Sequence, residues 1–258
     1  MGCHASKETP TTGRRSTRNR APAKGRTPNL KISTPSGGLE MIPTPQRDNT
    51  GWPIVPKSFE INRDQLLAAF QYMAEYLHER GVHPTIYVAG GAVNTIFLRS
   101  RHTTGDVDFF GSNQQGRLLK DASKHAQQRS ECQLGANWFN NSPSLFLNRT
   151  MENDLIGRSR QQGALLFQEP GLTVYAVPWQ YALRGKIDRM TKPLKRPYDI
   201  SDAVTYLHEC VNGYGGRAIQ AKLIESWAAK YDKAISTTVL CEIDAAYMNM
   251  YGGHGILF

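Results

Sequence analysis

The sequence predicts an α+β fold in which a small mixed β-sheet core is followed by a helical C-terminal part. Short β-branched runs alternate with helix-like segments in the middle of the chain, and apolar residues recur at helical spacing in its last quarter. The first 57 of the 258 residues show neither pattern. We therefore expect a tail at 1–57, a core at 58–190 and a helical region at 191–258.

The tail is rich in Pro, Gly, Ser, Thr and Arg, a composition that cannot bury enough apolar surface to offset the entropy of ordering. We expect it to be disordered. It contains ten Lys and Arg against three Asp and Glu, which is +7 of the chain's +9 net charge. The rest of the chain is nearly neutral. Nucleic-acid binding by the tail is disfavoured because it lacks interleaved aromatic residues for base stacking.

The first seven residues match an acylation pattern. Gly2 with Ser6 fits the acceptor sequence for N-myristoylation, and Cys3 offers a second site for palmitoylation. The arginines and lysines at 14–26 could add attraction to an anionic membrane surface. The alternative is an ordinary solvated basic tail. No apolar run is long enough to span a bilayer, so we expect a cytoplasmic protein that associates with membranes if the tail is acylated.

The core begins with a helix over 62–80. Asn62 is its expected cap, Gln65 completes a capping box and Gly81 ends it. A buried strand is expected at 85–89, because this run is short, apolar and rich in β-branched residues. It ends at a pair of glycines.

Further along, the pattern predicts a short helix from Val93, a strand over 106–110 and a polar helix over 116–129. The stretch 137–160 is hard to interpret, and we expect one strand there, at 144–147. A β-hairpin follows at 163–177. The remaining segments are expected to be helices, which we place at 178–190, from a cap at Asp199, at 217–231 and at 236–250.

The glycine pair and the second strand together indicate phosphate chemistry. Gly90 and Gly91, at a strand-to-helix turn, allow a phosphate to approach the backbone closely. Asp106 and Asp108 are two residues apart on a strand, so both carboxylates project from one face while Val107 faces the core. Such a pair suits Mg²⁺ that is also held by substrate phosphates, and two metals about 3.5–4 Å apart would stabilise both oxygens of a displacement.

Fourteen residues separate Gly91 from Asp106, enough for one helix and one turn. The whole arrangement resembles the DNA polymerase beta-type nucleotidyltransferase superfamily, whose signature is a small-residue pair, a helix and an Asp-x-Asp strand. It looks most like minimal nucleotidyltransferases related to the AbiEii-type toxins, which have an Arg and a Thr before the aspartates. Arg101, Thr103 and Thr104 match them here. The likeness covers about residues 85–210.

The resemblance implies roles for matching residues. Gly90, Gly91 and Thr104 would contact the nucleotide triphosphate, and Asp106 and Asp108 would be catalytic ligands of Mg²⁺ or Mn²⁺. Later in the chain, Lys186 would reach the nucleotide or the developing charge, and Asp202 or Asp199 would face the same cleft, where one could act as a base. Arg189 and Arg196 are the further counterparts of the family's basic positions.

The sequence departs from the superfamily at one point. Many of its members have a third carboxylate on a later strand, whereas the hairpin strand where we expect it contains Gln168. Glu169, Glu152 or Asp154 could substitute, the site could bind a single metal, or the domain could be degenerate.

Two functions therefore stay open. The first is transfer of a nucleoside monophosphate from an NTP to a hydroxyl of an unknown acceptor, which could be a small molecule, RNA or protein. The second is a catalytically degenerate protein that acts as a binding or membrane-tethered interaction module. The four cysteines show no spacing typical of a disulfide framework or a zinc site.

Overall fold

The computed structural model describes residue 41 and residues 46–54, 59–192, 195–230 and 235–258, all within one compact unit. The acylation candidates Gly2 and Cys3 lie outside these residues. Part of the expected tail is ordered, because β1 (Gln46–Arg47) and β2 (Pro53–Ile54) form a short antiparallel pair. The turn between them is held by the Asp48 side chain, which accepts hydrogen bonds from the Thr50 and Trp52 amides.

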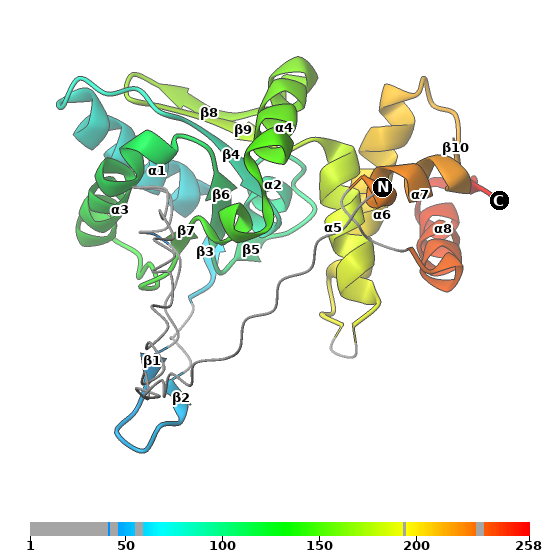
Figure 1. Ribbon diagram of the computed structural model, residues 1–258, viewed down its shortest axis with the longest axis horizontal. Helices are drawn as coiled ribbons and strands as arrows, with labels where there is room; N and C mark the ends of the chain where they lie inside the picture. Colours follow the sequence, from blue (N-terminus) through cyan, green and yellow to red (C-terminus); the bar gives the residue numbers. More distant parts are fainter. Residues whose placement is uncertain (1–40, 42–45, 55–58, 193–194, 231–234) are drawn as a thin grey trace, which may run out of the picture. The chain divides into compact units, whose positions relative to one another are not determined.

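The central feature is a five-stranded mixed sheet in the order β7-β6-β4-β9-β8 (Figure 1). The central strand β4 pairs antiparallel with β6 and parallel with β9, while β7 runs parallel to β6 at one edge. At the other edge, β8 and β9 form the expected hairpin. The strands are β4 (Thr85–Ala89), β6 (Val107–Phe110), β7 (Phe139–Asn140), β8 (Leu165–Glu169) and β9 (Leu172–Ala176).

Two long helices of the core pack against each other, α1 (Arg63–His78) and α3 (Gly116–Arg129). The capping box of α1 is formed as the sequence predicts: the Asn62 side chain accepts a hydrogen bond from the Gln65 amide, and the Gln65 side chain accepts one from the Asn62 amide. The apolar stripe of α1 is fully buried. The short α2 (Gly91–Ile96) follows β4 directly.

The expected strand at 144–147 is wrong. The chain forms a 3₁₀ helix there, η2 (Ser142–Phe146), and then α4 (Arg149–Gln162). Pro143 explains the difference, because proline lacks a donor for a strand ladder but fits the first turn of a helix. The Asn140 side chain also accepts a hydrogen bond from the Ser142 amide, which starts the turn. A second 3₁₀ turn, η1 (Asn113–Gln115), precedes α3.

The C-terminal part is helical, as expected. Helix α6 begins at Asp199 with Tyr198 at the N-cap position, so Asp199 lies in the first turn and is not the cap itself. Near the C-terminus, β10 (Ile219–Gln220) and β11 (Ile256–Leu257) form a parallel pair. The helices are α5 (Trp179–Met190), α6 (Asp199–Gly213), α7 (Ala221–Ala229) and α8 (Thr237–Tyr251).

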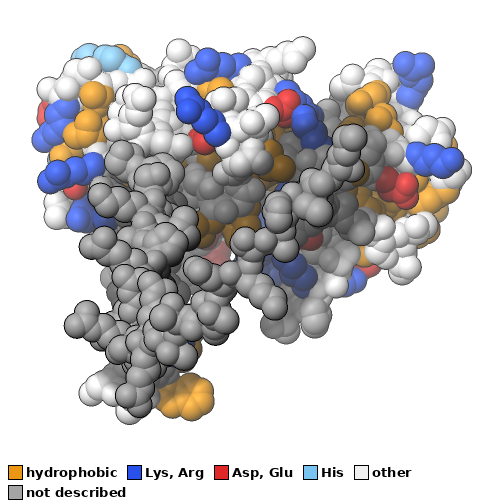
Figure 2. Space-filling model, viewed as in Figure 1, with side chains coloured by type: hydrophobic (Ala, Val, Ile, Leu, Met, Phe, Trp, Pro, Cys, Tyr) orange, Lys and Arg blue, Asp and Glu red, His pale blue; other side chains and the backbone are white. Residues whose placement is uncertain are grey.

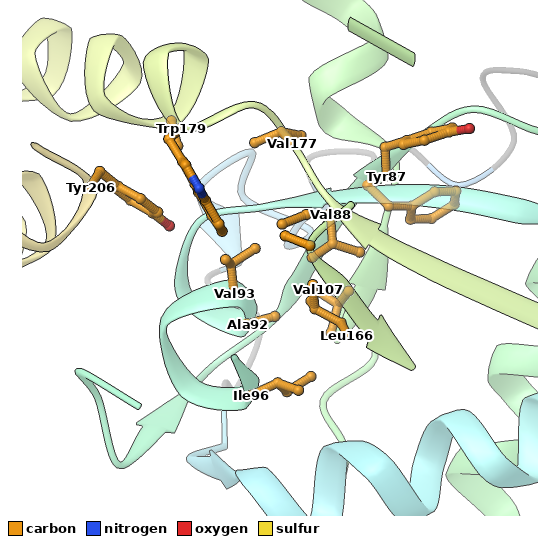
Figure 3. Packing of buried hydrophobic residues seen from close by; sticks show 14 of the residues in the cluster. Tyr87, Val88, Ala92, Val93, Ile96, Val107, Leu166, Val177, Trp179 and Tyr206 are labelled. Atoms are coloured by element: carbon orange, nitrogen blue, oxygen red, sulfur yellow. The ribbon is translucent and has the colours of Figure 1, made fainter. Parts of the chain in front are cut away.

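Apolar packing joins the helical part to the sheet. Figure 3 shows Trp179 of α5 and Tyr206 of α6 pointing toward Val93 and Ala92 of α2. Helix α5 packs most extensively with α6, so these two helices form one layer beside the glycine turn.

On the described surface visible in Figure 2, Lys and Arg side chains are spread among neutral ones. Among the helices that the structure describes, none combines the length and the apolar composition needed to cross a membrane.

Candidate functional site

The glycine turn between β4 and α2 requires each glycine for a different reason. Gly90 has φ of 74° and ψ of −141°, a backbone conformation that residues other than glycine rarely adopt. At Gly91 an added Cβ would lie 2.2 Å from the Thr104 Oγ1 atom. Thr104 is in β5 (Thr103–Thr104), which pairs antiparallel with β3 (Ile61–Asn62). The turn is therefore bare of side chains and closely backed by β5.

The two aspartates of the Asp-x-Asp motif lie beside this turn. Asp108 in β6 pairs with Ala89, the residue directly before Gly90. Asp106 immediately precedes β6 and is exposed, whereas Val107 between them is fully buried. Because side chains alternate along a strand, Asp106 and Asp108 share the face opposite to Val107. This is the arrangement that the spacing predicts, except that the strand starts one residue later.

The environment of the pair opposes full ionisation. The pKa of Asp108 is raised to about 6, first by burial and then by the negative charge of Asp106, while a hydrogen bond from the Asn140 side chain opposes the rise. Desolvation also raises the pKa of Asp106, and the charges of Arg196 and Arg189 oppose that rise. Two carboxylates that repel each other in a partly desolvated site would be stabilised by a divalent cation.

A pocket of about 310 Å³ connects the turn, Asp108 and α5. Its lining includes Gly90, Asp108 and Lys186, three residues far apart in the sequence. A larger hollow of about 660 Å³ lies elsewhere, between η1, η2 and α4, and Glu152 in it accepts hydrogen bonds from the Asn113 side chain. Of these two pockets, the smaller one is the one that joins a carboxylate of the Asp-x-Asp motif to a cationic side chain.

Behind this pocket is a buried ion-pair network. The Lys186 Nζ atom lies 2.5 Å from Asp202 Oδ2 and 3.4 Å from Asp199 Oδ1. Arg101 donates to both oxygens of Asp202, with Nε 2.8 Å from Oδ1. Asp202 is completely buried. Both of its oxygens are therefore occupied by cations, and it holds Lys186 and Arg101 in place.

Two tyrosines from the helical part complete the surroundings. The Arg101 guanidinium lies 3.5 Å from the centre of the Tyr198 ring, a cation–π contact. The Tyr206 hydroxyl lies 3.1 Å from the carbonyl oxygen of Gly90 and also contacts the Asn94 side chain. The glycine turn is thus braced by α6 as well as by β5.

The structure brings most of the predicted site residues together. Gly90, Asp108 and Lys186 line one pocket, Asp106 is next to it, and Gly91 contacts Thr104, whose Oγ1 donates to the Asp106 carbonyl oxygen at 3.2 Å. Asp202 is behind the pocket and does not line it.

The expected substitutes for a third carboxylate lie elsewhere. Glu169 and Gln168 are on the edge strand β8, separated from β6 by β9 and β4. Asp154 forms an ion pair with Lys230, at 2.7 Å. The actual neighbour of β6 is β7, where Asn140 pairs with Asp108. No sequence signal identified Asn140 or Tyr206, because their roles depend on strands and helices that are distant in the chain.

The donor set fits a metal that substrate oxygens help to bind. The described part of the chain contains no group of three or more His, Cys, Asp or Glu side chains that could hold a metal on its own. Asp106 and Asp108 supply two carboxylates, and an octahedral Mg²⁺ usually retains waters and phosphate oxygens in its other positions. The residues therefore fit Mg²⁺ or Mn²⁺ bound together with a nucleotide triphosphate.

Comparison with known proteins identifies a family for this chain. The model of the family described as a domain of unknown function (DUF7582) matches residues 59–254, which cover the sheet and the helical part. No curated protein and no solved structure matches the chain.

Proposed function

Because the chain belongs to the DUF7582 family, whose description assigns no activity, we propose its function from the geometry of the site: a metal-dependent nucleotidyltransferase of the DNA polymerase beta type. It would move a nucleoside monophosphate from an NTP to a hydroxyl of an acceptor. The observation that carries this proposal is the pairing of Asp108 with Ala89, which brings the carboxylate pair beside a bare glycine turn, where Asp108 lines a pocket together with Lys186.

Each group would act on a different part of the substrate. The backbone at Gly90 and Gly91 would approach the phosphates, since no side chain obstructs it. Lys186 and Arg189 line the pocket and would balance the charge of the phosphates and of the leaving pyrophosphate. Asp202 acts as a positioning residue in this scheme, because its oxygens are taken up by Lys186 and Arg101.

A divalent metal bound by Asp106 and Asp108 would supply Lewis-acid activation of the attacking hydroxyl and stabilisation of the leaving group. The acceptor oxygen forms a bond to the α-phosphorus, the bond to pyrophosphate breaks, and the hydroxyl proton leaves to solvent or to a nearby carboxylate.

One observation favours a second candidate function, nucleotide binding without transfer. Asn140 pairs with Asp108 at the position where an additional carboxylate would come closest to the motif, and an amide is neutral. A site with two carboxylates could hold a nucleotide and one metal, and the protein would then act as a ligand-dependent interaction module.

Thermal melting combined with a transfer assay tests both functions. The full chain is melted with and without each NTP and Mg²⁺ or Mn²⁺, and is incubated with α-labelled NTP plus fractionated cell extract containing small molecules, RNA or protein. A ligand that binds only the native state raises the melting temperature. We expect a rise and transfer of label in wild type, and neither in Asp108→Asn.

Asp64→Asn is the matched control, because the Asp64 side chain is 91% exposed and contacts only Arg63 in the described structure. It should behave as wild type. A rise in melting temperature without any transfer would support the binding module. If no NTP or metal changes the melting temperature of wild type, both functions are contradicted.

A further inference from the structure

We propose that the part of the pocket along α5 is a slot for the nucleobase, kept open by Gly185. This inference rests on the proposed function and identifies the site's nucleobase-binding surface. One wall is a face of α5, and the other is Phe146 of η2.

The α5 wall has a gap in its middle. Tyr181, Gly185 and Arg189 are four residues apart, so they occupy successive turns of one helix face, and all three line the pocket. Glycine inside a helix is unfavourable, because it loses more backbone entropy than alanine on folding. Gly185 therefore needs a reason for its place in the interior of α5.

Packing does not supply that reason. A Cβ built at Gly185 would have no neighbouring atom within 4 Å among the described residues, apart from its own helix, in contrast to Gly91, where the Cβ would strike Thr104. The missing side chain leaves room in the pocket between Tyr181 and Arg189. Gly185 thus provides space for a ligand.

Phe146 provides a surface for such a ligand. Its side chain is 79% exposed, although it lines the pocket and η2 packs against β6. An aromatic ring left this exposed can bury its apolar surface when a flat ligand stacks on it. Every nucleobase offers such a face.

The rest of the pocket indicates which flat ligand fits. Asp108, Lys186 and the glycine turn line the same pocket, so its occupant must combine an aromatic part with an anionic part that binds metal. A nucleoside triphosphate has both. The base would lie between Phe146 and Gly185, while the phosphates reach Asp108 and Gly90.

Calorimetric titration of the full chain with ATP and with inorganic triphosphate, both with Mg²⁺, tests the slot. Triphosphate lacks a base, so it reports on the metal and phosphate contacts alone. We expect Gly185→Leu and Phe146→Ala each to weaken ATP binding by roughly 5- to 150-fold, the range that one stacked base contributes. Their affinity for triphosphate should equal that of wild type.

Two variants serve as matched controls. Gly157 is an exposed glycine inside α4, and an added Cβ there also has no neighbour within 4 Å in the described structure. Gly157→Leu should bind ATP as wild type does. Both glycine variants should melt about 2–4 °C higher without ligand, because a helix-interior glycine is removed. Leu145→Ala removes a neighbouring side chain, 55% exposed, that does not line this pocket, and should also leave ATP binding unchanged.

The possible failures are distinguishable. The slot is wrong if Gly185→Leu and Phe146→Ala bind ATP normally, or if they lose ATP and triphosphate equally. The slot is also wrong if wild type binds ATP no better than triphosphate. That result would still support the metal and phosphate site. If wild type binds neither ligand, the proposed function fails together with the slot. If Gly185→Leu does not fold, Phe146→Ala still tests the slot. Phe146 is largely exposed, so its replacement should not unfold the protein.

Discussion

Two pairs of aspartates lie near the same pocket, and their surroundings differ: Asp108 of the first pair lines the pocket, whereas Asp202 of the second lies behind it. Asp106 and Asp108 are partly open to solvent, repel each other and have raised pKa values. Asp199 and Asp202 are buried, and both contact Lys186. Asp202 is also held by Arg101.

The difference shows that burial and neighbouring charges give the same type of side chain different roles. A buried carboxylate whose oxygens are occupied by cations is stable as an anion and fixes the geometry of its partners. A carboxylate with a like-charged neighbour and few cationic partners gains most from a metal or a proton. We therefore interpret the first pair as reactive and the second as positioning.

The largest effect is expected from Val107→Asp, which adds a third carboxylate to the motif but on its buried face. Val107 is fully buried, so the new charge would have neither solvent nor a partner. We expect a loss of about 5 kcal/mol or more in the free energy of unfolding, enough to unfold most of the protein. Circular dichroism and urea unfolding measure it. Gln168→Asp, in the exposed edge of the same sheet, should change stability by less than about 0.5 kcal/mol.

The second effect concerns the buried pair. Asp202→Asn removes the charge that Lys186 and Arg101 share, and leaves two partly buried cations without their ion-pair partner, although Asp199 still contacts Lys186. We expect a loss of about 3 kcal/mol, measured by urea unfolding. The matched control is Glu242→Gln, which removes an exposed ion pair with Lys195 and should cost about 0.2–1 kcal/mol. Equal losses in both variants would contradict the positioning role of Asp202.

A third prediction uses pH to compare the pairs. The pKa of Asp108 is raised from 3.8 to about 6 in the folded protein, so the folded state binds the proton more tightly than the unfolded state. Below about pH 4 the carboxyl is protonated and does not lower the free energy of unfolding. As the pH rises to about 6 it ionises in the folded protein, and this stabilising effect of the proton is lost. Asp108→Asn should therefore match wild type near pH 4 and exceed it at pH 7.

We expect that gain to be on the order of 1–2 kcal/mol, less than the full pKa difference implies, because the side chain is partly exposed and screened. Urea unfolding between pH 4 and 7 measures it, with Asp64→Asn as the exposed control. A variant that is less stable than wild type at pH 7 would contradict the reactive interpretation of the first pair.

The smallest effect on stability is expected from Asp106→Asn. Asp106 is exposed and precedes the strand, so its replacement relieves only a screened repulsion with Asp108 and should raise the free energy of unfolding by less than about 0.5 kcal/mol. The same change should abolish the rise in melting temperature expected with Mg²⁺ and NTP, because it removes one of the two proposed metal ligands. Retention of that rise would show that Asp106 is not needed for binding.

The sequence was informative where the signals are local. The Asn62–Gln65 capping box, the 85–89 strand and the hairpin turn at Gly171 depend on a few neighbouring residues, and the structure contains all three. The Asp-x-Asp spacing likewise predicts one shared face, because alternation along a strand is a local property.

The rest depended on contacts between distant segments. Asn140 acts through the pairing of β7 with β6, which no pattern within residues 137–160 indicates. Tyr206 is part of an apolar helix face and differs from its neighbours only because its hydroxyl reaches Gly90. Asp202 could be assigned to the cleft from the resemblance, but its burial between Lys186 and Arg101 required the folded chain.

The contact between Arg101 and Asp202 joins residues 101 positions apart, and the Tyr206 hydroxyl reaches Gly90 across 116 positions. A ribosome adds about 5–20 residues per second, so roughly 5–20 s pass between the synthesis of the glycine turn and that of the helix that braces it. During this time the growing chain carries both reactive aspartates without Asp202 and Tyr206. We expect a nascent chain to acquire the proposed nucleotide site only after α6 has left the ribosome, so shorter nascent chains should not bind nucleotide.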